Sequence, residues 1–312
     1  MGVYLSKEYT QAIKGVAIFL VVICHIGNNY TRLFTPLGGI GVSLFLILSA
    51  YGLEMSYKKN KLKNFWYKRL KTVFVPYIVL ELIMQLTFNS INFATFIMDI
   101  TLLKPLFPLG WYLNYLMLMY ISFWIIKKAF NKDTSLIFVL LSVVFGAVFF
   151  FTNNGIRFEQ SLAFPIGLLL ANVKEGRLEK FFDFRFGLCL IIVAIFFLAI
   201  KQIPIIRIDY KSMIFVLDLF VKTFFSCGIL MIFYSFYKAN KVVKVFSIYK
   251  MLGKYSYELY LVHGYALCVF SYFYCGEALC LFLTITIMGV SFLVYIERKT
   301  IDSFNKYKLN KF

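Results

Sequence analysis

The chain has 312 residues, of which 61% are hydrophobic and 20% aromatic, and its formal net charge is +18. Its 37 Phe and 22 Tyr residues are hard to bury in a soluble globule of this length, so the composition argues against a soluble fold and favours a membrane protein. No basic stretch carries the signature of a nucleic-acid-binding fold, so the positive charge indicates contact with anionic lipid headgroups and no nucleic acid partner.

Long apolar runs recur to the end of the chain and predict an all-α, polytopic membrane protein of ten transmembrane helices. We expect these helices to form a single integral-membrane domain over residues 1–312. The first run lacks a small-residue cleavage site, which favours a retained helix over a signal peptide. The predicted spans are 11–27, 38–56, 72–90, 111–126, 134–151, 158–173, 184–200, 213–237, 252–273 and 277–296.

The basic residues are distributed unevenly between the two sides of these spans. Alternate connections, together with Lys7, Lys14 and the C-terminal tail, hold 26 of the 33 Lys and Arg residues, and the opposite connections hold six. Since cytoplasmic loops carry an excess of Lys and Arg, both termini are predicted to be cytoplasmic.

The first span, IKGVAIFLVVICHIG, carries two polar groups eleven residues apart, Lys14 and His25. Eleven residues is close to three helical turns, so both side chains lie on one face, roughly 16 Å apart along the axis. Polar groups in an apolar helix are costly in lipid and usually line a polar cavity. An imidazole can accept a proton from a hydroxyl at physiological pH, which makes His25 the first candidate for a catalytic base.

Four acidic or basic residues within the other spans have different expected roles. Glu81 lies in mid-helix without a local cation, which favours either helix packing or a polar cavity. Glu54 is near the cytoplasmic end of its helix and is expected to reach water. Asp218 and Lys222 are four residues apart and are expected to neutralise each other along one helix face.

The ninth span contains LGKYSYELYLVHGY, which includes the second histidine. Ser256, Tyr260 and His263 recur at helical spacing and form one polar stripe. A structural hydrogen bond is the favoured role for His263, with proton transfer as the alternative. Trp111 opens the fourth span at the outer surface, where it is either an interfacial anchor or a stacking platform for a sugar.

The sequence also bears on two other kinds of function, metal binding and proton-coupled transport. The two histidines lie on separate helices without clustered thiolates or an HExxH motif, so no metal site is predicted. A proton-coupled transporter of lipid-linked sugars or small anions remains an alternative, in which His25 and Glu81 would relay protons.

Five segments together resemble the membrane acyltransferase 3 family, whose members O-acylate extracytoplasmic glycans. In chain order these segments are AIKGVAIFLVVICH, GVSLFLILSAYGL, FWYKRLKTVFVPY, GWYL and LGKYSYELYLVH. The branch that includes succinyltransferases of exopolysaccharide clusters is similar in size. Two positions depart from the family pattern, because Lys14 stands where an arginine is usual and Ser49-Ala50 stands where Ser-Gly is common.

The resemblance implies a multi-pass protein of a bacterial plasma or inner membrane that uses acyl-coenzyme A, with acetyl as the expected group, and a glycan hydroxyl as acceptor. Lys14 and Arg69 would meet the phosphates of the donor at the cytoplasmic edge. His25 would either deprotonate the sugar hydroxyl or accept the acyl group transiently. Trp111, Tyr260, His263 and Glu81 are the candidates for substrate contact. Sequence leaves the acyl group, the glycan and the oligomeric state open.

Overall fold

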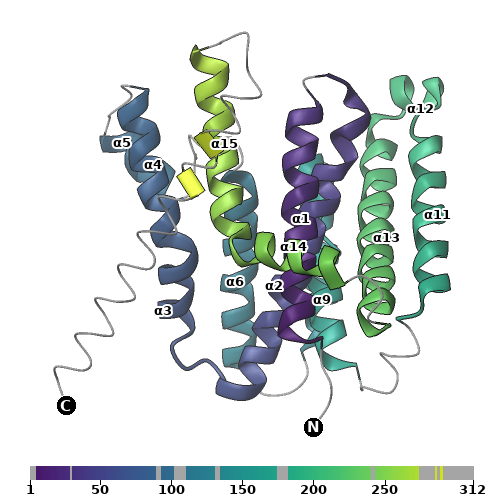
Figure 1. The fold of residues 1–312 in the computed structure, drawn as a ribbon, viewed down its shortest axis with the longest axis horizontal. Coiled ribbons are helices and arrows are strands. Elements are labelled where there is room, and N and C mark those ends of the chain that lie inside the picture. Colours follow the sequence, from purple (N-terminus) through teal and green to yellow (C-terminus); the bar gives the residue numbers. More distant parts are fainter. Residues whose placement is uncertain are drawn as a thin grey trace. The chain divides into compact units, whose positions relative to one another are not determined.

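The structure is a computed structural model that describes residues 5–28, 30–88, 93–101, 110–130, 134–173, 182–239, 243–273, 285–286 and 289–290. Within these ranges every regular element is a helix and there is no strand (Figure 1). The all-α prediction is therefore confirmed for this part of the chain. The chain divides into two compact units, unit 1 with residues 1–63 and 115–254 and unit 2 with residues 64–114 and 255–312.

Unit 1 contains most of the long helices. α1 packs against both α2 and α14, α2 packs against α9, and α11 packs along α13. Figure 1 shows α14 lying across α1. The helices of this unit are α1 (Lys7–Gly27), α2 (Thr35–Asn60), α7 (Ser135–Phe151), α8 (Gly155–Phe158), α9 (Ala163–Asn172), α11 (Phe184–Ile200), α12 (Pro204–Asp209), α13 (Lys211–Lys238) and α14 (Val243–Lys254), with a short 3₁₀ turn, Arg32–Phe34, before α2.

Unit 2 is built around α4 and α15, which contact each other. Its helices are α3 (Phe65–Arg69), a π-helical turn (Leu70–Phe74), α4 (Val75–Thr87), α5 (Phe93–Ile100) and α15 (Ser256–Phe273). α6 (Gly110–Ala129) contributes its first residues to this unit and the rest to unit 1. The Tyr257 hydroxyl donates a hydrogen bond of 2.6 Å to the Val73 carbonyl, and the Thr87 and Tyr265 hydroxyls are 2.8 Å apart. These two contacts fix α15 along α4.

The helices agree in position with the predicted spans up to 252–273, each of which coincides with a helix or a pair of helices. The tenth predicted span, 277–296, lies mostly outside the described residues. By length and composition, four described helical segments can cross a membrane, namely Lys7–Gly27, Arg32–Asn60, Phe65–Thr87 and Ser212–Lys238. Ser135–Phe151 and Phe184–Ile200 are apolar but shorter. The chain is thus a membrane protein, and the number of spans and their orientation stay predictions.

Glycines allow the helices of unit 1 to approach closely. A Cβ atom on Gly41 of α2 would lie 2.5 Å from the Ala17 carbonyl oxygen of α1, and one on Gly167 of α9 would overlap the Ile47 carbonyl of α2. Small residues at helix contacts are the usual means of close packing in membranes, where the hydrophobic effect between helices is weak. α1 is therefore held tightly against α2 along the segment that precedes His25.

Candidate functional site

The face of α1 that carries Lys14 and His25 points to the protein interior. Ile18 and Val21 lie between these two residues on the same helical stripe, and each is only 1% exposed. Lys14 and His25 themselves are half-buried. Phe19, on the other side of the helix, is 42% exposed. The imidazole therefore projects from the face that packs in the protein and not from the face that a lipid would cover.

Polar contacts fix the end of α1 next to His25. The Cys24 thiol lies 3.4 Å from the Thr35 carbonyl oxygen at the start of α2, and the Asn28 side-chain amide lies 3.6 Å from the Cys24 sulfur. The Thr35 hydroxyl donates a 2.8 Å hydrogen bond to the Asn28 side-chain oxygen. These three residues tie the last turn of α1 to the first turn of α2. The backbone at His25 is consequently fixed by contacts of the residues that precede and follow it, Cys24 and Asn28.

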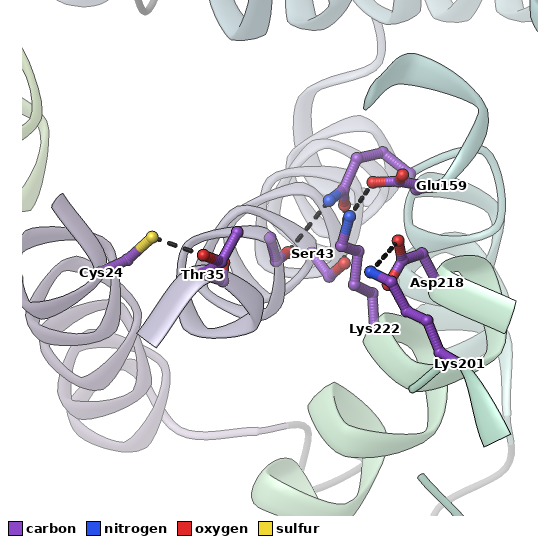
Figure 2. Close-up of polar contacts among 9 residues, drawn as sticks. Cys24, Thr35, Ser43, Glu159, Lys201, Asp218 and Lys222 are labelled. Atoms are coloured by element: carbon purple, nitrogen blue, oxygen red, sulfur yellow. Dashed lines mark hydrogen bonds and ion pairs between the residues drawn. The ribbon is translucent and has the colours of Figure 1, made fainter. Parts of the chain in front are cut away.

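Two ion pairs lie beside the same end of α2, as Figure 2 shows. Lys222 of α13 pairs with Glu159, which follows α8, and Lys201, just after α11, pairs with Asp218 of α13 at 2.7 Å. The expected pairing of Asp218 with Lys222 is therefore wrong. Each residue instead has a partner from another segment, because both α8 and α11 contact α13.

Uncharged polar groups adjoin these ion pairs. The Ser43 hydroxyl donates a 2.6 Å hydrogen bond to the Gln160 side-chain oxygen, and the Gln160 amide donates to the Gly39 carbonyl at 3.0 Å. Ser226 of α13 donates to the Ile40 carbonyl at 3.2 Å. All three side chains are buried. The first half of α2 is thus bordered by hydrogen-bonding groups from α13 and from the turn between α8 and α9.

A further ion pair lies toward the opposite end of α2. Glu54 pairs with Lys127 of α6 at 2.9 Å, and the side chains of Glu54 and Lys127 are only 4% and 1% exposed. The Lys127 ammonium also lies 4.7 Å from the centroid of the Tyr57 ring. The expectation that Glu54 reaches water is therefore wrong, because α6 supplies a cation that sequence spacing does not reveal.

In unit 2 the structure brings several predicted site residues together. The Tyr112 and Tyr260 ring centroids are 5.1 Å apart, those of Tyr260 and His263 are 5.6 Å apart, and the Trp111 ring lies 6.4 Å from that of Tyr112. Tyr260 and His263 are buried, as is Ser256, so the predicted stripe on α15 is a buried face. A ring nitrogen of His263, Nδ1, lies 2.9 Å from the Leu259 carbonyl oxygen, in accordance with the favoured structural role.

Glu81 lies in a buried row of polar residues on α4. It is 0% exposed, and Tyr77 and Gln85, one turn away on either side, are 1% and 3% exposed. The Gln85 amide donates a 2.8 Å hydrogen bond to the Asp99 carboxylate, and the Tyr77 hydroxyl donates to the Asp99 backbone carbonyl at 3.0 Å. Asp99 therefore attaches the short helix α5 to α4 on the face that also carries Glu81.

The predicted site residues are shared between the two units. Lys14 and His25 belong to unit 1, whereas Arg69, Glu81, Trp111, Tyr260 and His263 belong to unit 2. Arg69 is half-buried, and its guanidinium carbon lies 5.6 Å from the centroid of the Phe65 ring. Its packing on an aromatic ring orients the guanidinium group within unit 2. The roles of all seven residues stay predictions.

A comparison with protein families assigns the chain to a family. Residues 8–298 match the family model described as an acyltransferase domain. The chain belongs to the acyltransferase 3 family. The resemblance found in the sequence is thereby confirmed over nearly the whole chain. Comparisons with curated proteins and with solved structures give no significant match.

Sequence reasoning missed part of the polar network of this acyltransferase. Glu159, Gln160 and Lys201 were not singled out, because each lies at a helix end where an ordinary reading is contact with water. The adjacent glycines Gly38 and Gly39 were an available signal. Neighbouring glycines early in a membrane helix often mark a close approach of other side chains, and here Cys24 and Lys222 occupy the space beside them.

Proposed function

We propose that this acyltransferase moves an acyl group, with acetyl as the expected one, from cytoplasmic acyl-coenzyme A to a hydroxyl of an extracytoplasmic or lipid-linked glycan. Family membership supports acyl transfer. The observation that carries the proposal is the interior stripe of α1, on which Lys14 and His25 flank the buried Ile18 and Val21.

His25 is the proposed catalytic residue. An imidazole nitrogen takes the proton of the sugar hydroxyl while the oxygen attacks the thioester carbonyl. The carbon–sulfur bond then breaks, and coenzyme A leaves as a thiol after receiving a proton. In the second route the imidazole first accepts the acyl group, releases coenzyme A, and then passes the group to the sugar. Both routes need the imidazole on the side of α1 that faces the protein interior.

Lys14 and Arg69 are the proposed contacts for the anionic part of the donor. Ammonium and guanidinium groups form strong charge-assisted hydrogen bonds with phosphate oxygens. The separation of Lys14 and His25, roughly 16 Å along the helix, is one that the long arm of coenzyme A can span. We place the protein as a single multi-pass domain in the plasma or inner membrane of a bacterium, with both termini cytoplasmic, in contact with anionic lipids.

Trp111, Tyr260, His263 and Glu81 are proposed to contact the substrates from unit 2. The clustered rings of Tyr112, Tyr260 and His263 combine aromatic faces with polar groups next to Trp111, a combination that suits a sugar or the pantetheine arm. Neither the acyl donor nor the acceptor requires a metal in this scheme, since the imidazole supplies the base.

A reconstituted transfer assay tests the proposal. Purified protein in lipid vesicles is incubated with labelled acetyl-coenzyme A and with surface glycans from the cell that naturally produces the protein. The label transferred to the glycan is then measured. We expect His25→Ala to abolish transfer, whereas Phe19→Ala, on the exposed side of α1, retains it. Unchanged transfer by folded His25→Ala protein would remove the imidazole from the mechanism. Movement of a sugar driven by a proton gradient, with acyl-coenzyme A left intact, would favour the transporter instead.

A further inference from the structure

The three ion pairs found among the described residues of unit 1 differ in how accessible they are. Around the Lys127–Glu54 pair the side chains are 1% and 4% exposed, so that pair is sealed. The side chains of Lys222 and Glu159 are each 10% exposed, and those of Lys201 and Asp218 are 24% and 9% exposed. The second and third pairs are therefore less completely buried than the first, with Lys201 the most exposed of the four, and they adjoin each other because Asp218 and Lys222 are one turn apart on α13.

Stabilisation of the fold does not by itself explain why these two less buried ion pairs are present. Removing ions from water costs several kcal/mol per ion, and the mutual attraction often does no more than offset this cost, so apolar residues of similar size would hold the helices as well. Four charged side chains on or beside the first half of α13 thus point to a function. Lys222 contacts Gly39 in the first turns of α2, which follow the α1–α2 turn that the charge distribution of the loops predicts to face the outside.

The cluster packs on the first turns of α2, which also contact the end of α1 that carries His25. A Cβ atom on Gly38 would lie 2.8 Å from the Cys24 sulfur of α1, and one on the next residue, Gly39, would collide with the Lys222 side chain. Cys24 and Lys222 therefore contact neighbouring residues of α2. The first turns of α2 thus lie between the ion-pair cluster and Cys24, the residue directly before His25 (Figure 2).

The composition of the cluster indicates the chemistry of its ligand. Lys222 and Lys201 donate hydrogen bonds, while Glu159 and Asp218 accept them, and the four charges sum to zero. Because the four charges cancel, the cluster offers no net attraction to a phosphate or another anion. A sugar hydroxyl both donates and accepts, so it can bind a lysine and a carboxylate together without adding charge.

We propose that Lys222, Glu159, Lys201 and Asp218 form a subsite for the acceptor, which binds the hydroxyls of a neutral sugar unit next to the unit that is acylated. This inference rests on the proposed function. The subsite lies beside the reacting hydroxyl and not at it, so these residues bind substrate and take no part in bond breaking. They would hold the acceptor so that its hydroxyl meets the imidazole.

Direct binding tests the subsite independently of acyl transfer. Labelled neutral oligosaccharides are released from the surface polysaccharide of the cell that naturally produces the protein. Their affinity for the protein in lipid nanodiscs is then measured. We expect Lys222→Met and Glu159→Gln each to weaken binding at least tenfold. His25→Ala should retain binding, so loss of transfer in that variant and loss of binding in the others are separate results.

Two further variants distinguish ligand binding from helix packing. Lys127→Met breaks the sealed pair and serves as the matched control, since it should lower the amount of folded protein and leave the affinity of the folded fraction unchanged. The exchange Lys222→Glu with Glu159→Lys keeps an ion pair, and it should restore folding without restoring the affinity. Full affinity in folded Lys222→Met protein, or in the exchanged variant, would overturn the subsite, as would binding of acidic oligosaccharides alone.

Discussion

Gly15 and Gly253 meet where α1 crosses α14, and a Cβ atom on either one would overlap a backbone carbonyl of the other helix. The carbonyls are those of Tyr249 for Gly15 and of Gln11 for Gly253. Backbone atoms cannot move aside as a flexible side chain can. The crossing therefore places α14 directly against the α1 segment from Gln11 to Gly15, which includes Lys14.

We predict that Gly15→Ala and Gly253→Ala each destabilise the protein by about 1–3 kcal/mol, the range for overpacking a close contact. Thermal unfolding in detergent, followed by the amount of monodisperse protein, measures the effect. Gly52→Ala is the matched control, since a Cβ atom there meets nothing within 4 Å and alanine is the better helix former. Equal stability of Gly15→Ala and Gly52→Ala would mean that the helices cross at a greater distance.

The sealed pair Glu54–Lys127 gives a second stability prediction. Glu54→Ala should cost about 3–5 kcal/mol, because it leaves a buried ammonium without its carboxylate. The double variant Glu54→Gln with Lys127→Met should recover most of this loss, since neither charge then remains. Unfolding midpoints of the two variants test the prediction. It is contradicted if the single variant is as stable as the original protein, which would indicate that Glu54 is hydrated.

The outcome for these charged residues shows how far sequence reasoning extends. The helix positions were predicted because apolar runs and their length are local properties of the chain. Glu54 and Lys127 are 73 residues apart, and Lys222 and Glu159 are 63 apart, so no local spacing reveals either pair. The predicted pair of Asp218 and Lys222 was wrong for the same reason, because tertiary contacts supplied another partner for each. That Lys14 and His25 share one face of α1 was predictable, since it follows from helical periodicity alone.

Lys14 gives a prediction about the donor. Lys14→Met should raise the KM for acetyl-coenzyme A at least tenfold, or about 1.4 kcal/mol, because a charge-assisted contact to phosphate is lost. Lys14→Arg should retain low KM, as a guanidinium binds the same oxygens and is the usual group in the family. Lys7→Met, an exposed position on the same helix, is the control. A KM unaffected by Lys14→Met would exclude this lysine from donor binding.

Substitutions of Trp111 distinguish a role in sugar stacking from a role in membrane anchoring. Its ring packs on that of Tyr112 at an interplanar angle of 77°. The Tyr112 ring also packs on Tyr260, so the indole of Trp111 belongs to the aromatic cluster of unit 2. We predict that Trp111→Ala raises the KM for the glycan acceptor about tenfold, because loss of stacking on a ring costs roughly 1–3 kcal/mol by analogy with bases on aromatic side chains. The amount of folded protein should stay the same, and Trp111→Phe should retain most of the acceptor affinity. Measuring both quantities in both variants decides the matter. If protein abundance and transfer fall in parallel in Trp111→Ala, the indole is an interfacial anchor and the stacking role is excluded.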